Sequence, residues 1–285
     1  MKKTTTLRNL LAQPGAIVAP GVYDALGARV VQSVGFNAVY MTGNGAMASL
    51  LGKPDLALAT MTEMVTRAHQ IAACVDIPLI CDADTGYGGL INVRRTVEEF
   101  EAAGVAGIHI EDQITQKRCG ALGGVQLVSI EEASNRIETA ANARRDSDFL
   151  IIARTDAKDV YGIDEAIHRV NQYLSAGADM AMVEGLTSLD EVKKVADSIN
   201  GPLFFNIYER VREEAFSVKD LEAAGAKLII NCLTSTLYNA ANLKKLYTEF
   251  KETGCTAKYA ELMMPMSEYT DILGIERETS LTGSF

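Results

Sequence analysis

Carboxylate side chains come directly after two short apolar runs of this sequence, at the point where each run ends. Asp82 and Asp84 follow the run 78–81, and Glu111 follows the run 107–110. Residues two apart in an extended chain point the same way, so Asp82 and Asp84 would face one pocket. Three carboxylates suit Mg²⁺, or Mn²⁺ in its place. The alternative is a set of strand-end carboxylates that only cap nearby helices.

Three further polar residues, Arg154, Glu184 and Asn206, end apolar runs later in the chain. An arginine can bind a carboxylate or phosphate through two parallel hydrogen bonds. A structural ion pair of Arg154 with Glu184 or Asp156 is the alternative, and the two interpretations are compatible. Together with the carboxylates, these residues predict a cation site beside an anion site.

Two glycine-containing loops could complete such a site. The segment Thr42-Gly43-Asn44-Gly45 could cradle an anion with its backbone N–H groups, although the same residues are typical of an ordinary turn. The second loop carries Cys119 directly after Lys117 and Arg118, and two cations beside a thiol lower its pKa. With glycines at 123–124, this loop could act as a lid. A cysteine exposed by chance is the alternative.

The elements that must position these residues are eight apolar runs separated by helical patterns. Continuous apolar strands alternating with amphipathic helices are typical of a parallel sheet. Eight such units predict an α/β fold, a (β/α)8 TIM-type barrel, whose strand ends meet at one mouth. The alternative, an open doubly wound sheet, would have a Gly-x-Gly-x-x-Gly turn that is missing here. The predicted strands are Ile17–Ala19, Ala38–Met41, Pro78–Cys81, Gly107–Ile110, Leu150–Ala153, Met180–Val183, Leu203–Phe205 and Leu228–Ile230.

Composition narrows the class of protein. The 285 residues are 48% hydrophobic and 22% charged, with a net charge of −10, which disfavours nucleic-acid and anionic-membrane partners. No apolar stretch approaches the roughly 18 residues of a spanning helix, and no signal sequence is evident, so we expect a cytoplasmic protein. The five cysteines are scattered and predict neither a zinc site nor a disulfide framework.

The C-terminal part is expected to extend a single barrel domain over residues 1–285. Ala240–Lys251 is predicted to form a helix, and Tyr259–Leu273 a shorter helical segment rich in methionine. These helices could pack on a neighbouring subunit. The alternative is that they close their own barrel.

The order and spacing of these motifs resemble those of the isocitrate lyase/phosphoenolpyruvate mutase superfamily over nearly the whole chain. The branch of short chains, which includes 2-methylisocitrate and 2,3-dimethylmalate lyases, is the most similar. The motifs that carry the resemblance are Asp82–Gly88, Glu111–Gln113, Lys117–Gly120 and Ala153–Ala157.

The resemblance implies a homotetramer whose subunits exchange the eighth barrel helix. It also implies a magnesium ion bound directly by Asp84, with Asp82 and Glu111 holding its water molecules. Cys119 would be the general acid/base on a mobile loop. The residues that the resemblance places around the substrate are Tyr40, Thr42, Gly43, Asn44, Gly120, Arg154, Glu184 and Asn206.

The implied activity is magnesium-dependent cleavage of a carbon–carbon bond in a 2-hydroxy di- or tricarboxylate, which gives an α-keto acid such as pyruvate and a second carboxylate. Tyr40 or a metal-bound hydroxide would remove the hydroxyl proton, and Cys119 would protonate the carbanion. Hydrolysis or decarboxylation of oxaloacetate is the main alternative. A phosphonomutase, which Cys119 disfavours, and a non-catalytic keto-acid binder are two others.

The sequence also departs from the superfamily pattern at three places. Ala121 stands where the lyases usually have a histidine, and no nearby histidine replaces it. The segment 210–213 replaces a usual Gly-x-Thr-Pro, and Asn231–Ser235 replaces the commoner Tyr-Pro-Leu-Ser. These changes are expected to line the place of the second product.

Overall fold

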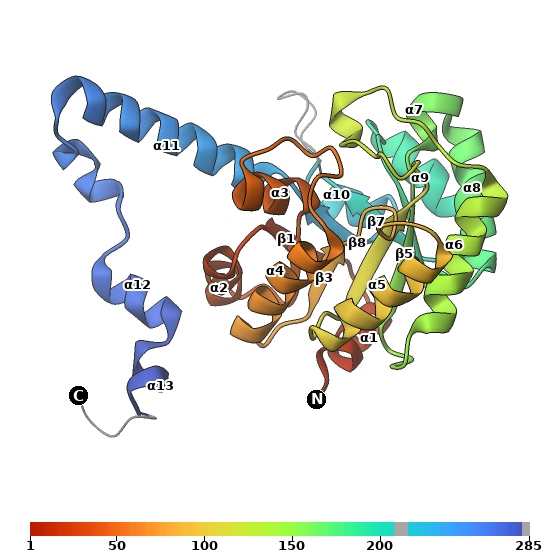
Figure 1. Cartoon of the computed structure of the whole chain (residues 1–285), viewed down its shortest axis with the longest axis horizontal. Coiled ribbons are helices and arrows are strands. Elements are labelled where there is room, and N and C mark those ends of the chain that lie inside the picture. Colours follow the sequence, from red (N-terminus) through yellow and green to blue (C-terminus); the bar gives the residue numbers. More distant parts are fainter. Residues whose placement is uncertain (208–215, 281–285) are drawn as a thin grey trace.

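Eight parallel strands pair in chain order, and β8 pairs with β1, so that the sheet closes into a barrel (Figure 1). The computed structural model describes residues 1–207 and 216–280, apart from the side chain of Ala121, and the segment 210–213 therefore lies outside the described residues. The strands are β1 (Ile17–Val22), β2 (Val39–Met41), β3 (Leu79–Asp82), β4 (Gly107–Glu111), β5 (Leu150–Thr155), β6 (Met180–Val183), β7 (Leu203–Asn206) and β8 (Ala226–Asn231).

The predicted fold is confirmed, and each of the eight predicted strands overlaps an observed one. The main difference lies at the carboxyl ends, where several strands run one or two residues further than predicted. Asp82, Glu111, Arg154 and Asn206 are therefore part of their strands. The reason is that hydrogen bonding between strands continues past the last apolar residue, as in the pairing of Glu111 with Arg154.

Helices connect the strands and cover the outside of the barrel. Four of the helices are followed by glycines with positive φ, Gly35, Gly104, Gly177 and Gly225, and this left-handed conformation ends a helix. The helices, with η for 3₁₀, are α1 (Lys3–Ala12), α2 (Ala25–Val34), α3 (Gly43–Leu51), α4 (Met61–Cys74), α5 (Leu90–Ala102), η1 (Gly120–Leu122), α6 (Ile130–Ala143), α7 (Ala157–Tyr161), α8 (Ile163–Ser175), α9 (Leu189–Ser198), α10 (Val218–Ala223), α11 (Thr234–Thr253), η2 (Ala257–Leu262), α12 (Met266–Leu273) and α13 (Ile275–Ser280).

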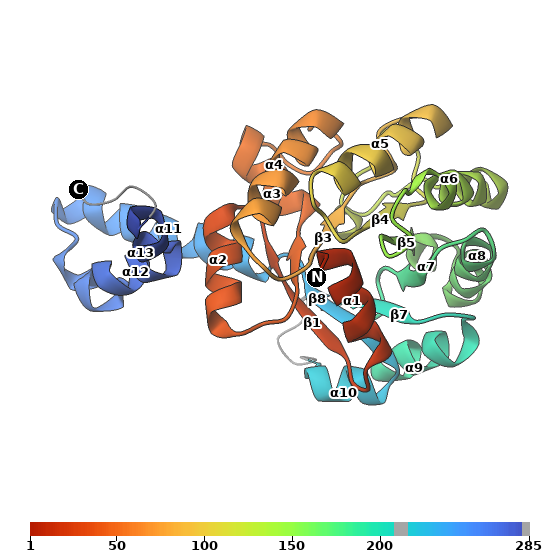
Figure 2. The same cartoon turned by 90° about the horizontal axis from the view of Figure 1, so that it is seen from below.

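The amino end of the barrel is closed by α1, which lies across the centre of the ring of helices in Figure 2. Its Leu7 is fully buried and packs with the side chains that fill the barrel interior, among them Ile17, Ile152 and Phe204. The other large apolar cluster lies between the strands and the surrounding helices. With one end filled in this way, the carboxyl ends of the strands are left to form the site.

The last helices leave the barrel. Figure 1 shows α11 projecting away from it, and none of the residues of α11 is buried. The prediction of a helix at Ala240–Lys251 is confirmed, but the alternative that it closes its own barrel is wrong in this structure. The chain then returns towards α2, where Arg29 Nε donates a hydrogen bond of 2.7 Å to the carbonyl of Ile272. Within the described residues, no helix is both long and apolar enough to cross a membrane.

Candidate active site

A cavity of about 40 Å³ lies at the carboxyl ends of the strands. Ten of the predicted site residues line it, namely Tyr40, Thr42, Asn44, Asp82, Glu111, Cys119, Gly120, Arg154, Glu184 and Asn206. The other lining residues are Asp55, Lys117, Arg118, Met182, Ile230, Cys232 and Leu233. Since one water molecule needs roughly 10–15 Å³ measured in this way, the cavity holds only a few waters as it stands.

Asp84 and Gly43 are the two predicted residues that do not line this cavity. Asp84 follows the end of β3 with a φ of +48°, so it does not point with Asp82 as strand spacing predicted, and it lines a neighbouring cavity instead. Its backbone N–H donates to Asp82 Oδ1 at 3.0 Å. Gly43 lies behind Asp82, because a Cβ added there would come within 2.3 Å of Asp82 Oδ2.

The segment Thr42-Gly43-Asn44-Gly45 is not a simple turn but the first turn of α3. Thr42 is its N-cap, and the hydroxyl accepts a hydrogen bond of 3.4 Å from the N–H of Gly45. The N-terminus of a helix offers unpaired N–H groups and a positive partial charge, both of which favour anions. This geometry supports the predicted anion-binding role.

The ammonium group of Lys117 lies between two buried aspartates, Asp55 and Asp84. Nζ lies 2.5 Å from Asp84 Oδ1 and 2.7 Å from Asp55 Oδ1. Burial raises the pKa of Asp84 to about 6, against the opposing effect of Lys117. Burial alone would lower the pKa of Lys117, but Asp84 and Glu111 outweigh it and raise the pKa well above its usual value. At neutral pH the pair is therefore ionised.

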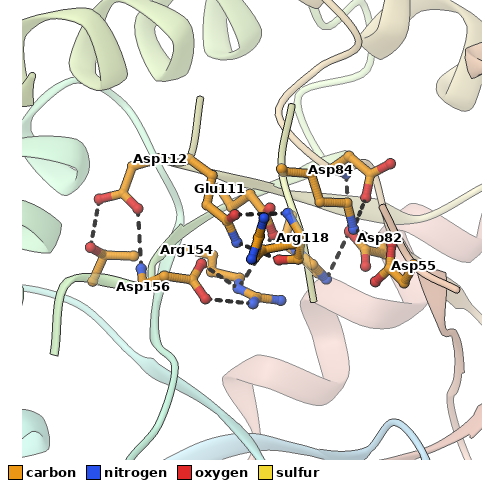
Figure 3. Close-up of polar contacts among 12 residues, drawn as sticks. Asp55, Asp82, Asp84, Glu111, Asp112, Arg118, Arg154 and Asp156 are labelled. Carbon is orange, nitrogen blue, oxygen red and sulfur yellow. Dashed lines mark hydrogen bonds and ion pairs between the residues drawn. The ribbon is translucent and has the colours of Figure 1, made fainter. Parts of the chain in front are cut away.

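Arg154 forms the cationic side of the cavity. Its guanidinium binds Asp156 through two hydrogen bonds, of 3.0 Å from Nε and 2.8 Å from Nη2, and its Nε lies 3.5 Å from Glu111 Oε2 (Figure 3). Burial opposes its charge, but Asp156, Glu111 and Glu184 raise the Arg154 pKa well above its usual value. The predicted ion pair with Asp156 therefore exists, and it holds the guanidinium at the cavity.

Asp112, directly after Glu111, binds the end of β5 next to Arg154. Its carboxylate accepts hydrogen bonds from the Thr155 hydroxyl at 2.6 Å, the Asp156 backbone N–H at 3.1 Å and the Tyr173 hydroxyl at 2.9 Å. Arg169 adds an ion pair at 3.2 Å. A buried carboxylate with this many partners fixes the backbone that carries Arg154.

The Cys119 loop, residues 115–125, covers the cavity. Its Gly120 approaches the Arg154–Asp156 pair so closely that a Cβ there would lie 3.0 Å from Asp156 Oδ1. The backbone N–H of Cys119 donates to the carbonyl of Asp55 at 3.1 Å. Lys117 was predicted to lie beside the thiol, but its ammonium contacts Asp55 and Asp84 instead.

Tyr40 lies inside the barrel below the cavity. Its hydroxyl is 2.7 Å from His109 Nε2, and the two rings stack. Burial and the Asp82 carboxylate raise the Tyr40 pKa well above 10, while burial lowers the His109 pKa to about 4. Both groups are therefore neutral at pH 7, which disfavours the prediction that Tyr40 acts as the base.

The carboxylates suit an ion that is bound largely through water. Within the described part of the chain, no three His, Cys, Asp or Glu side chains are close enough together to bind one metal ion directly. However, Asp82, Asp84 and Glu111 offer oxygen donors, Glu111 Oε1 is buried and accepts no hydrogen bond from the described residues, and the Lys117 ammonium shows that Asp84 accepts a cation. Magnesium keeps several waters and needs only one or two carboxylates, so these residues fit it.

Asp55 was missed from the sequence. It lies in the connection between α3 and α4, not after a strand, so the strand-end pattern could not find it. The segment Asn231–Ser235 was expected to line the site, and two of its residues, Cys232 and Leu233, do line the cavity. Cys232 also donates its backbone N–H to Asn206 Oδ1 at 3.2 Å.

The barrel, the buried charges at its mouth and the covering loop define an enzyme of the TIM-barrel class. Residues 7–251 match the family described as phosphoenolpyruvate phosphomutase. The chain belongs to this family, within the phosphoenolpyruvate mutase/isocitrate lyase superfamily, as the motifs predicted.

Relatives of the chain include named lyases. It is 42% identical to a 2,3-dimethylmalate lyase of Eubacterium barkeri, over 97% of this chain and 96% of the relative. It is 38% identical to a 2-methylisocitrate lyase of Aeropyrum pernix, over 94% of this chain and 86% of the relative. These relatives support the prediction that the protein is a carbon–carbon lyase.

Solved structures agree with this placement. An oxaloacetate acetylhydrolase in complex with the inhibitor 3,3-difluorooxalacetate superposes with a TM-score of 0.94 at 35% identity, over 100% of this chain and 98% of that one. A phosphonopyruvate hydrolase in complex with oxalate and Mg²⁺ gives 0.87 at 27% identity, over 99% and 98% of the two chains.

Proposed function

We propose that the protein is a magnesium-dependent lyase that cleaves the C2–C3 bond of a 2-hydroxy di- or tricarboxylate of the 2,3-dimethylmalate or 2-methylisocitrate type. The observation that carries the proposal is one cavity lined by Asp82, Glu111, Arg154 and the Cys119 loop. Such a substrate has a 2-hydroxy carboxylate for the ion that the carboxylates would hold and a second anionic group for the arginine. The lyase relatives support the same reaction class.

Asp84 would hold the ion directly, and Asp82 and Glu111 through water; Mn²⁺ could replace Mg²⁺ there. When bound, the ion lowers the pKa of the substrate hydroxyl and polarises the carbonyl that forms. Arg154 and the first turn of α3, with Thr42 and Asn44, hold the carboxylate ends.

The chain's own proton chemistry is assigned to the Cys119 loop. As the C2–C3 bond breaks, its electron pair goes to C3, and the thiol of Cys119 delivers a proton there. The proton of the 2-hydroxyl, which the ion makes more acidic, would pass to a water molecule of the cavity. Tyr40, neutral at pH 7, would donate a hydrogen bond to the substrate. Glu184 and Asn206, which line the same cavity, complete the contacts that orient the substrate.

Product identification tests the proposal. Incubated with Mg²⁺, 2,3-dimethylmalate should give pyruvate and propionate, and 2-methylisocitrate should give pyruvate and succinate. Chelation of the metal should abolish both reactions, and an Asp84→Asn variant should lose the same activity. If pyruvate and oxalate bind but no 2-hydroxy acid is cleaved, the proposal is wrong and the protein is a keto-acid binder.

Hydrolysis of oxaloacetate is a second candidate, favoured by the close superposition on oxaloacetate acetylhydrolase. The same incubation with oxaloacetate separates the possibilities. Oxalate and acetate would indicate a hydrolase, whereas pyruvate and carbon dioxide would indicate a decarboxylase.

We also propose that the protein is a cytoplasmic homotetramer in which neighbouring barrels exchange α11. Three observations support the exchange of α11: the helix has no buried residue, its apolar side chains are exposed, and a cavity of about 500 Å³ opens between β1, α2 and the base of α11. The exposed apolar residues of α11 are Leu237, Tyr238, Leu243, Tyr247 and Phe250.

Light scattering on the purified protein tests the assembly. A Tyr247→Glu/Phe250→Glu variant should yield smaller species, whereas Lys244→Glu, a charge change at an exposed polar position of the same helix, should not. A monomeric wild type would overturn this part of the proposal.

A further inference from the structure

The Cys119 loop stands on a short stem formed by residues 112–114 and 126–128. The two stem segments pair antiparallel: Ile114 N–H donates to the Gln126 carbonyl and Val128 N–H to the Asp112 carbonyl, each at 3.0 Å. The stem is held to the barrel at both sides. Arg136 donates to the carbonyl of residue 113 at 2.7 Å, and Arg169 to that of residue 128 at 3.0 Å.

One side chain reaches from the stem into the loop. Gln113 is buried, with 1% of its surface exposed. Its Oε1 accepts a hydrogen bond of 3.1 Å from the backbone N–H of Arg118, and its Nε2 donates one of 3.0 Å to the Arg118 carbonyl. Both backbone groups of the residue before Cys119 are thus bound by one amide, which we call the amide clamp.

Only a primary amide can make this clamp. A carboxylate accepts but does not donate, and an apolar side chain does neither. The clamp joins two parts of the chain that are five residues apart. One part, the stem, is anchored by Arg136. The other part, the loop, must move to admit a substrate, because the covered cavity has room for only a few waters.

We propose that Gln113 is the positioning residue that holds the Cys119 loop closed, by pairing its amide with the backbone of Arg118. Two neutral hydrogen bonds are strong enough to favour the closed loop and weak enough to be broken at each opening. The stem, in contrast, keeps its backbone pairing when the loop opens. The expected effect of Gln113 on turnover depends on the proposed role of Cys119, whereas its effect on loop opening does not.

Hydrogen exchange measured by mass spectrometry tests the clamp without any substrate. Gln113→Glu removes the donor, and Gln113→Met removes both donor and acceptor at similar size. Both variants should exchange the backbone amides of residues 115–125 about tenfold faster than the wild type, the factor expected for one or two lost hydrogen bonds. Gln126→Glu makes the same chemical change at an exposed glutamine near the loop and should leave the exchange rates unchanged.

Turnover supplies the second readout. In both Gln113 variants kcat should fall about tenfold, while the magnesium affinity and the exchange of the barrel helices stay at wild-type values. Wild-type exchange of residues 115–125 in both variants would overturn the inference. So would faster exchange throughout the barrel in both, because Gln113 would then support the fold as a whole. A failure of the Cys119 role would leave the exchange result intact and would appear separately, as unchanged turnover in Cys119→Ser.

Discussion

The two ends of the barrel bury charge in different ways. At the amino end, Arg8 and Arg144 share Asp179 at 2.8 and 2.6 Å, each of these side chains keeps some contact with water, and the interior beside them is filled by Leu7. At the carboxyl end, several carboxylates share Lys117 and Arg154 around a cavity, almost without solvent.

The difference separates stability from chemistry. Partly exposed ion pairs such as those of Asp179 add little net stability, so the amino end is held mainly by apolar packing. Burial at the mouth raises the pKa values of Asp84 and Glu111. Buried groups with shifted pKa values are typical of sites that bind or convert a ligand. Substitutions at the mouth should therefore alter turnover, and those at the other end should alter the free energy of unfolding.

The largest expected effect is on the chemistry of the mouth. Cys119→Ser should lower kcat by about 10²- to 10⁴-fold, because a positioned acid/base contributes about this much. The melting temperature and magnesium affinity should stay at wild-type values, since the half-buried thiol is not part of the core. Steady-state kinetics on the cleaved 2-hydroxy acid measure the change. Unchanged turnover would remove Cys119 from the mechanism.

The matching change at the amino end is Leu7→Ala. Truncating a fully buried leucine should cost about 2–5 kcal/mol of unfolding free energy. Urea denaturation measures the loss, and kcat of the folded fraction should be that of the wild type. A large loss of kcat in the folded protein would show that packing at the amino end also determines catalysis at the mouth, and the distinction between the two ends would be wrong.

A pH experiment examines the boundary between the two ends, where His109 lies buried under the mouth. Its pKa is lowered by burial to about 4, so between about pH 6.5 and 4 the unfolded chain binds a proton that the folded chain does not. The free energy of unfolding should therefore fall as the pH falls through this window, by about 3 kcal/mol in total.

Denaturation of wild type and His109→Gln at pH 7 and pH 4.5 isolates this contribution. The variant should lose about 2–3 kcal/mol less than the wild type between the two values, because glutamine does not titrate. Equal losses in the two proteins would mean that other groups set the acid stability.

An effect of similar size, on catalysis, comes from a single methyl group. Gly43→Ala places a Cβ 2.3 Å from Asp82 Oδ2, which should displace that carboxylate and lower kcat/KM about 100-fold, the usual result of misplacing a site by about 1 Å. Gly89→Ala is the control, since a Cβ there meets no atom within 4 Å. Equal kinetics of the two variants would show that the position of Asp82 is unimportant.

Much of this organisation could be predicted from the sequence. Buried parallel strands require continuous apolar runs, so the eight strands and the polar side chains at their ends follow from local patterns. The polar strand ends were placed correctly in the mouth for Asp82, Glu111 and Arg154.

Contacts between connections could not be predicted in this way. The positive φ of Asp84 turns its side chain away from the strand pattern, and Asp55 reaches the site from a connection with no strand signal. Lys117 was assigned to the thiol because the two are near in sequence, whereas its ammonium is held by carboxylates from distant segments. Such contacts depend on how the loops fold over one another, and the spacing of apolar residues in the sequence carries no information about that.

Lys117 lies between Asp55 and Asp84, at the proposed magnesium site. Carboxylates that hold a metal ion repel one another when the ion is removed. The Lys117 ammonium would supply the compensating positive charge, so we expect the protein to stay folded when no ion is bound.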